Sequence, residues 1–143
     1  MDITEFLTAR YDEDEGVARA VDVDDDPSDG RWRVEEASDY TGIREWRVGA
    51  DVSWGFSWAA RTYDEVAAAY IVTWDPARAL ADLTAKRAIV AEYRTHAEHR
   101  QRYGDKETDY SWGARTKLDW ICKLLAAPYA EHPDYDLAWR IDG

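Results

Sequence analysis

The stretch RWRVEEASDYTGIREWRVGADVSWGFSWA, residues 31–59, contains the pattern that decides the fold class. Large apolar residues alternate with polar ones throughout it, and they are Trp32, Val34, Trp46, Val48, Val52, Trp54, Phe56 and Trp58. A period of two is typical of antiparallel strands with one buried face. Turn-forming residues at 39–42 and 49–51 divide the stretch. We therefore expect a three-stranded antiparallel meander with one dry and one wet face.

The flanking segments follow helical spacing instead. Residues 3–21 predict an amphipathic helix capped by Asp2, with an inner face of Ile3, Phe6, Leu7, Val17, Ala18 and Val21. A second helix is expected over residues 64–73, ending at Trp74. Asp75 then caps a third helix that has Pro76 in its first turn and can run to Tyr103.

A last helix is expected from about residue 115, and Pro128 ends it. Its inner face would carry Leu118, Ile121, Cys122 and Leu125, which follow a spacing of three and four residues. We expect the aromatic tail to fold back over the core through Tyr129, Tyr135 and Trp139. We also expect Trp54, Leu125 and residues 120–124 to lie between the sheet and this helix.

These elements predict an α+β fold, with an N-terminal helix, a three-stranded antiparallel meander and then three helices packed on one face of the sheet. A chain of 143 residues fits one domain. Within a single domain spanning 1–143, we expect an acidic helix and loop (1–30), a sheet (31–59), helices (60–127) and an aromatic tail (128–143).

Three blocks of the chain carry a family resemblance. They are FLTARYDEDE at 6–15 followed by VARA at 17–20, DPARAL at 75–80 leading into AKRAIV at 85–90, and LLAAPYAEHPDY at 124–135 with Trp139 beyond it. Together they cover about half the chain and resemble the DUF6221 family, uncharacterised small proteins of actinobacteria and their phages. The resemblance implies a host range and a shared fold, but no activity.

One position pair departs from that family pattern. Relatives often carry two His four residues apart, where this chain has Tyr70 and Trp74. A metal-binding or proton-transfer role for such a pair therefore cannot operate here, and we expect both aromatic rings to be packed.

Composition restricts the environment of the protein. The sequence has no apolar run long enough for a transmembrane helix, and its first residues lack the features of a signal peptide. A single Cys permits no internal disulfide and argues against a Cys-based metal cluster. We expect a cytoplasmic protein that does not bind membranes.

Negative charge is concentrated at the start of the chain. Residues 1–30 contain 11 acidic and 2 basic residues, a net charge of −9, whereas the whole chain has −12. Such a segment repels a nucleic-acid backbone, so we expect no direct nucleic-acid binding. It fits a protein partner with a basic surface, or it serves solubility alone. The candidate partner-binding acids are Asp12, Glu13, Asp14, Glu15, Asp24, Asp25 and Asp26.

Motifs for metal binding and catalysis are weak. Asp24, Asp26 and Ser28 match the start of a calcium-binding EF-hand loop, but its Gly comes one residue late, at Gly30. His96 and His99 have a spacing that can hold zinc, but nothing marks further ligands. Cys122 lies on an apolar helix face, where a thiol is inert. We therefore predict no catalytic residue, no metal ligand and no cofactor.

Three aromatic residues, Tyr110, Trp112 and Trp139, are not explained by periodicity. They either form an exposed anchor for a partner or pack onto the domain. The leading hypothesis is a non-catalytic protein-interaction or regulatory protein, which could compete for a partner that binds nucleic acid. A small enzyme with carboxylate-based or metal-assisted chemistry is the alternative, and a structural phage component is a third option. The sequence does not predict the oligomeric state.

Overall fold

The computed structural model describes residues 1–21, 31–53, 55–103 and 109–141, apart from the side chains of residues 103 and 109–111. Contacts divide the chain into two compact units. We call residues 15–82 the sheet unit, and residues 1–14 with 83–143 the helical unit. Two long helices, α1 and α3, each contribute residues to both units.

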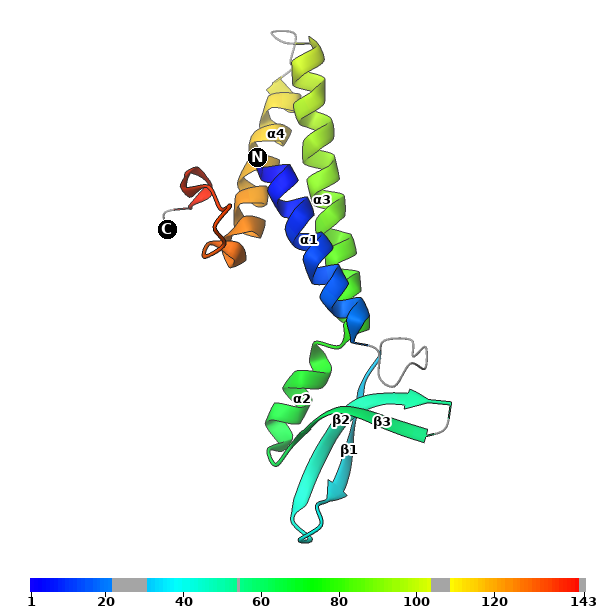
Figure 1. The fold of residues 1–143 in the computed structure, drawn as a ribbon. Coiled ribbons are helices and arrows are strands. Elements are labelled where there is room, and N and C mark those ends of the chain that lie inside the picture. Colours follow the sequence, from blue (N-terminus) through cyan, green and yellow to red (C-terminus); the bar gives the residue numbers. More distant parts are fainter. Residues whose placement is uncertain (22–30, 54, 104–108, 142–143) are drawn as a thin grey trace. The chain divides into compact units, whose positions relative to one another are not determined.

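The order of the elements confirms the predicted α+β class (Figure 1). The chain forms α1 (Ile3–Ala20), β1 (Arg33–Ser38), β2 (Arg44–Val52), β3 (Gly55–Thr62), α2 (Glu65–Thr73), α3 (Pro76–Tyr103) and α4 (Asp109–Ala126), followed by the 3-10 turns η2 (Ala127–Tyr129) and η3 (Leu137–Trp139). Among the described residues, no helix combines the length and apolarity needed to span a bilayer.

The sheet is an antiparallel meander in the order β1-β2-β3. The first turn lies where the sequence predicts it. One carboxylate oxygen of Asp39 accepts the backbone N–H groups of Thr41 at 2.8 Å and Ile43 at 2.9 Å. Gly42 completes the turn with a φ of 82°, a conformation that favours glycine.

The second predicted turn, at residues 49–51, is wrong. Strand β2 runs through these residues to Val52, and β3 begins at Gly55. Gly49 instead lies buried where the pairing of β2 with β3 shifts register, and a Cβ at this position would be 2.0 Å from the carbonyl oxygen of Ser57. The glycine is therefore required by the close approach of β3 and not by a turn.

This shift also changes which side chains share a face. Val48 pairs with Ala60, but the next residue, Gly49, pairs with Trp58. Because directly paired residues point to the same side of a sheet, Trp58 lies on the opposite face from Val48. The expectation that both lie on one dry face is wrong, and Trp58 is half exposed.

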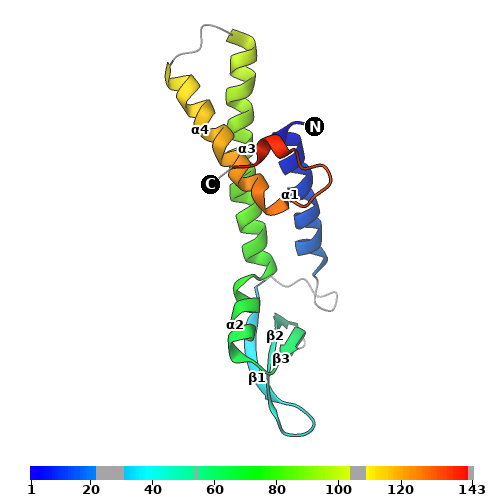
Figure 2. The ribbon, with the colours of Figure 1, turned by 90° about the vertical axis from the view of Figure 1, so that its left-hand side faces the viewer.

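Apart from Glu45, the buried residues of the sheet unit have small side chains. Val48 and Ala50 of β2, Ser57 of β3 and Ala68 of α2 are all buried, and α2 contacts all three strands (Figure 2). Asp64 caps α2 as its N-cap residue. These short side chains allow α2 to lie close to the sheet.

The predicted junction between α2 and α3 is confirmed. Helix α2 stops at Thr73, and Asp75 accepts the backbone N–H of Arg78 at 2.7 Å, which caps α3. Pro76 follows as the first residue of α3. The second carboxylate oxygen of Asp75 accepts the backbone N–H of Trp32 at 3.3 Å, so the same side chain also fixes the chain just before β1.

In the helical unit, α1, α3 and α4 run side by side (Figures 1 and 2). Its buried core consists of Ile3, Phe6, Leu7, Tyr11, Leu83, Val90, Cys122, Ala126 and Trp139. Leu125 packs against this core, whereas Trp120 and Leu124 are exposed. The expectation that Leu125 and residues 120–124 lie between the sheet and the last helix is therefore wrong, and Trp54 lies outside the described residues.

The tail folds back as predicted, and it does so around one ring. Phe6 is fully buried, and the ring centroids of Tyr129, Tyr135 and Trp139 lie 6.2, 6.0 and 5.0 Å from its own. Aromatic pairs at these separations stabilise beyond the area that they bury. The tail thus adds Trp139 to the core of the helical unit and packs Tyr129 and Tyr135 against it.

Helix α1 differs from its predicted face in its second half. Asp2 and Glu5 form the expected start, because each side chain accepts the backbone N–H of the other residue. The core contribution of α1 ends at Tyr11, and Val17 and Val21 are exposed. Helix α4 also begins earlier than expected, at Asp109 in place of about residue 115.

The bulge at Gly49 leads to a stability prediction. Gly49→Ala places a methyl group against the backbone of Ser57, and overpacking of this kind costs about 1–3 kcal/mol. Gly16→Ala is the matched control, because Gly16 is helical with open space around it, and Ala gains up to about 1 kcal/mol there. Urea denaturation of both variants measures the difference, and an unchanged midpoint for Gly49→Ala would contradict the bulge.

Candidate protein-binding surfaces

The four consecutive acids of α1 each have a partner within the chain. Asp12 forms an ion pair with Arg87 of α3 at 2.7 Å, and Asp14 accepts the hydroxyl of Tyr129. Glu13 pairs with Arg10 at 2.9 Å, and Glu15 pairs with Arg19 at 2.8 Å. The remaining predicted acids, Asp24, Asp25 and Asp26, lie outside the described residues.

These contacts separate the acidic run into two classes. Asp12 and Asp14 connect α1 to α3 and to the tail, whereas Glu13 and Glu15 bind arginines of their own helix. Exposed pairs of this kind contribute up to about 1 kcal/mol each. The run therefore presents negative charge to solvent, but two of its members also have a structural role.

Arg10 is the one basic residue of α1 that is buried. Its guanidinium lies 5.4 Å from the centre of the Phe6 ring and contacts the ring of His132. His132 also accepts the backbone N–H of Asp134 at 3.1 Å, a local bond within the tail. The contact with Arg10 was not predicted, because these residues are far apart in the sequence.

Helix α4 has an apolar stripe on its outer side. Trp112 is 58% exposed, Trp120 is 52% exposed, and Leu124 follows one turn later with a similar exposure. The opposite side of the helix contributes Cys122 and Ala126 to the core. Since residues spaced by four lie on one side of a helix, these three side chains form one surface that the core does not use. We call it the α4 stripe.

The other two predicted aromatic anchors have different positions. Trp139 is only 8% exposed and packs on Phe6, so the packing alternative holds for it. Tyr110 lies in the first turn of α4, and its side chain is outside the described residues. Of the three, Trp112 is the one whose ring the structure places at the surface.

Polar contacts of Asp119 lie beside the α4 stripe, and one of them joins α4 to α3. Asp119 accepts the hydroxyl of Tyr93 at 3.0 Å and pairs with Lys123 at 2.9 Å. Burial, together with the Asp119 carboxylate, raises the pKa of Tyr93 to about 12. Burial also raises the pKa of the Cys122 thiol to about 11, so this Cys is not a nucleophile at neutral pH.

A second apolar surface lies on α2. Tyr70 and Trp74 are both exposed, and the guanidinium of Arg78 lies 4.7 Å from the centre of a Trp74 ring. The expectation that both rings are packed is therefore wrong. The reason is that the inner side of α2 uses Ala68 against the sheet, which leaves no room for large rings.

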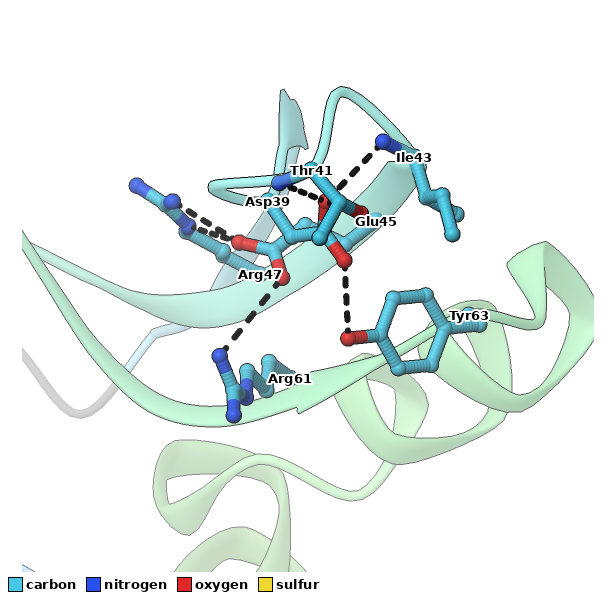
Figure 3. Close-up of polar contacts among 7 residues, drawn as sticks. All are labelled: Asp39, Thr41, Ile43, Glu45, Arg47, Arg61 and Tyr63. Carbon is cyan, nitrogen blue, oxygen red and sulfur yellow. Dashed lines mark hydrogen bonds and ion pairs between the residues drawn. The ribbon is translucent and has the colours of Figure 1, made fainter.

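The sheet unit also has a buried carboxylate that the sequence analysis missed (Figure 3). Glu45 is 1% exposed, and one of its oxygens accepts hydrogen bonds from Arg47 at 2.7 Å. Arg61 lies 3.8 Å from the other oxygen. Arg47 and Arg61 are direct cross-strand partners, an arrangement that repels, and Glu45 neutralises it. The cluster therefore has a structural explanation.

The remaining candidates are metal-binding groups and a pocket. Among the described residues, no group of His, Cys, Asp and Glu is arranged to hold a metal ion. His96 pairs with Glu92 at 3.3 Å on its own helix. A pocket of about 490 Å³ at the start of α1 includes Asp2, Arg94 and Glu98, but Asp2 is already engaged. Burial raises its pKa, yet hydrogen bonds from Glu5 and Thr4 outweigh this effect and lower it.

Comparison with known proteins identifies the family. Residues 1–141 match the family model of DUF6221, a family of unknown function, and the chain therefore belongs to that family. No curated protein and no solved structure matches the chain.

The raised pKa values predict how stability changes in alkali. Tyr93 and Cys122 ionise more readily in the unfolded chain than in the folded one, so their contribution is complete below pH 9 and is lost as pH rises to about 11 and 12. The double variant Tyr93→Phe with Cys122→Ala should lose less stability between pH 8.5 and 11.5 than the native chain. Urea midpoints at several pH values measure this, and parallel curves would contradict burial of both groups.

Proposed function

We propose that this member of the DUF6221 family is a non-catalytic protein-interaction or regulatory protein, and that it binds another protein through the α4 stripe. The proposal includes a cytoplasmic location and an actinobacterial or phage origin. The presence of a single Cys favours the location, and the family resemblance favours the origin.

The α4 stripe carries the proposal. Two tryptophans and a leucine lie exposed on one side of a helix whose other side is already in the core. Exposed Trp side chains are costly in water, and Trp is among the residues that contribute most to protein interfaces. Their position on a helix packed against the core also presents them without a large ordering cost.

The acidic start of the chain supports a partner with a basic surface. Asp12, Glu13 and Asp14 remain exposed to solvent although each has a partner within the chain. Charge of this kind acts mainly on the rate of association. A basic partner that normally binds nucleic acid would be occupied by this surface, so we propose competition with nucleic acid as the regulatory effect.

Capture from a lysate tests the α4 stripe. The immobilised chain is exposed to an actinobacterial lysate, and bound proteins are identified by mass spectrometry. Trp120→Ala should weaken binding of the partner about thirtyfold, the effect of losing an interface hot spot. Leu137→Ala is the control, because this residue is more exposed but lies in the tail. Equal recovery of every bound protein by both variants would reject the stripe.

Association kinetics test the acidic surface with the captured partner. The best probe is Glu13→Gln with Glu15→Gln, because Glu13 pairs with Arg10 and Glu15 pairs with Arg19, and both arginines belong to α1 itself. The double variant should associate several-fold more slowly at low salt, and the difference should shrink near 0.5 M salt as screening shortens to about 4 Å. Identical rates at low salt would leave solubility as the role of this charge.

A further inference from the structure

The outer side of α2 carries three apolar residues in a symmetrical arrangement. Val66 is 78% exposed, Tyr70 is 69% exposed and Trp74, just after the helix, is 53% exposed. Tyr70 lies four residues from each of the other two, so it is the centre of this surface. Ala69 and Thr73 are also exposed and are small enough to let another helix approach closely. We call these five residues the α2 surface.

Charges of opposite sign lie at the two ends of the α2 surface. Glu65 is exposed at the Val66 end, and it has no ion pair within the part of the chain that the structure describes. Arg78 is exposed at the Trp74 end, where its guanidinium contacts the Trp74 ring but pairs with no described carboxylate. One negative and one positive group are therefore available at opposite ends of an apolar strip.

From this arrangement we infer that the α2 surface binds a second copy of the chain, with the two α2 helices antiparallel. A two-fold axis through Tyr70 brings Glu65 of each copy to Arg78 of the other, and it sets the small Val66 against the large Trp74. Such a contact is isologous, because one patch meets an identical patch. The inference goes beyond the proposed function, since it concerns the oligomeric state and uses a different surface.

The area that the dimer buries indicates how strongly the two copies bind. Each copy brings two large aromatic side chains, which bury about 150–250 Å² each when fully covered. Because Tyr70 and Trp74 are already partly covered, with 69% and 53% exposed, the pair with Val66 and the flanking side chains buries at most about 1,000 Å², the lower limit of a specific interface. The dimer is therefore weak and depends on concentration.

Sedimentation of the full chain tests the inference. Between about 1 and 500 µM, a range that includes weak interfaces of this size, the native chain should pass from monomer to dimer. Tyr70→Ala should weaken the dimer about thirtyfold. Tyr40→Ala is the control, because Tyr40 lies in the same unit and is 98% exposed, and this variant should dimerise normally.

A charge exchange tests the antiparallel arrangement. Glu65→Arg alone and Arg78→Glu alone should each weaken the homodimer, because like charges then meet. An equimolar mixture of the two variants should form a heterodimer of about native affinity, since both cross-contacts are again between opposite charges. Circular dichroism and thermal melts confirm that each variant is folded.

Three outcomes would overturn the inference. If the native chain stays monomeric up to the highest concentration, the α2 surface does not bind a second copy of the chain. A dimer that Tyr70→Ala does not weaken uses another surface. A mixture of the two charge variants that associates no better than each variant alone excludes the antiparallel arrangement.

Discussion

The ring of Phe6 is the point on which the helical unit depends. It is fully buried, and four rings of the tail surround it, those of Tyr129, His132, Tyr135 and Trp139. Arg10 lies against the same ring and contacts His132, so a charged group is enclosed in an aromatic environment. A side chain near the start of the chain therefore organises residues 129–139.

The core of the sheet unit is built from small side chains, in contrast to the aromatic core of the helical unit. Apart from Glu45, its buried side chains include Val48, Ala50, Ser57 and Ala68, and at Gly49 even a methyl group would be too large. A core with so little side-chain volume covers Trp32, Trp46 and Phe56 only in part and leaves other rings of this unit exposed. The exposure of Trp58, Tyr70 and Trp74 is thus a consequence of how closely α2 and β3 approach β2. The aromatic residues that suggest a large core in the sequence are here partly at the surface.

The structural features that could be predicted from the sequence are those set by residues close together along the chain. The period-two alternation predicts the sheet, Asp75 and Pro76 predict the start of α3, and Pro128 predicts the end of α4, because each acts within one turn. Gly49 was misread as a turn residue because the strand that it accommodates lies several residues further along the chain. The burial of Arg10 was missed for the same reason, since its partner is His132.

The candidate binding surfaces show the same difference between features set by neighbouring residues, which could be predicted, and features set by distant residues, which could not. Helical spacing was sufficient to place Leu125 and Cys122 on the inner side of α4, but not to place Trp120 and Leu124 outside. Tyr70 and Trp74 were expected to be packed because large rings usually are, and the sequence contains no signal for the small contacts under α2. The structural roles of Asp12 and Asp14 were equally hidden, because their partners, Arg87 and Tyr129, are distant in sequence.

The discontinuity of the helical unit has a consequence for synthesis of the protein. The sheet unit is one continuous segment, residues 15–82, and it can complete its contacts while the ribosome is still translating the remainder. The helical unit needs both Phe6 and Trp139, and these lie on opposite sides of the sheet unit in the sequence. The apolar side of α1 therefore stays uncovered until the segment that contains Trp139 has been synthesised.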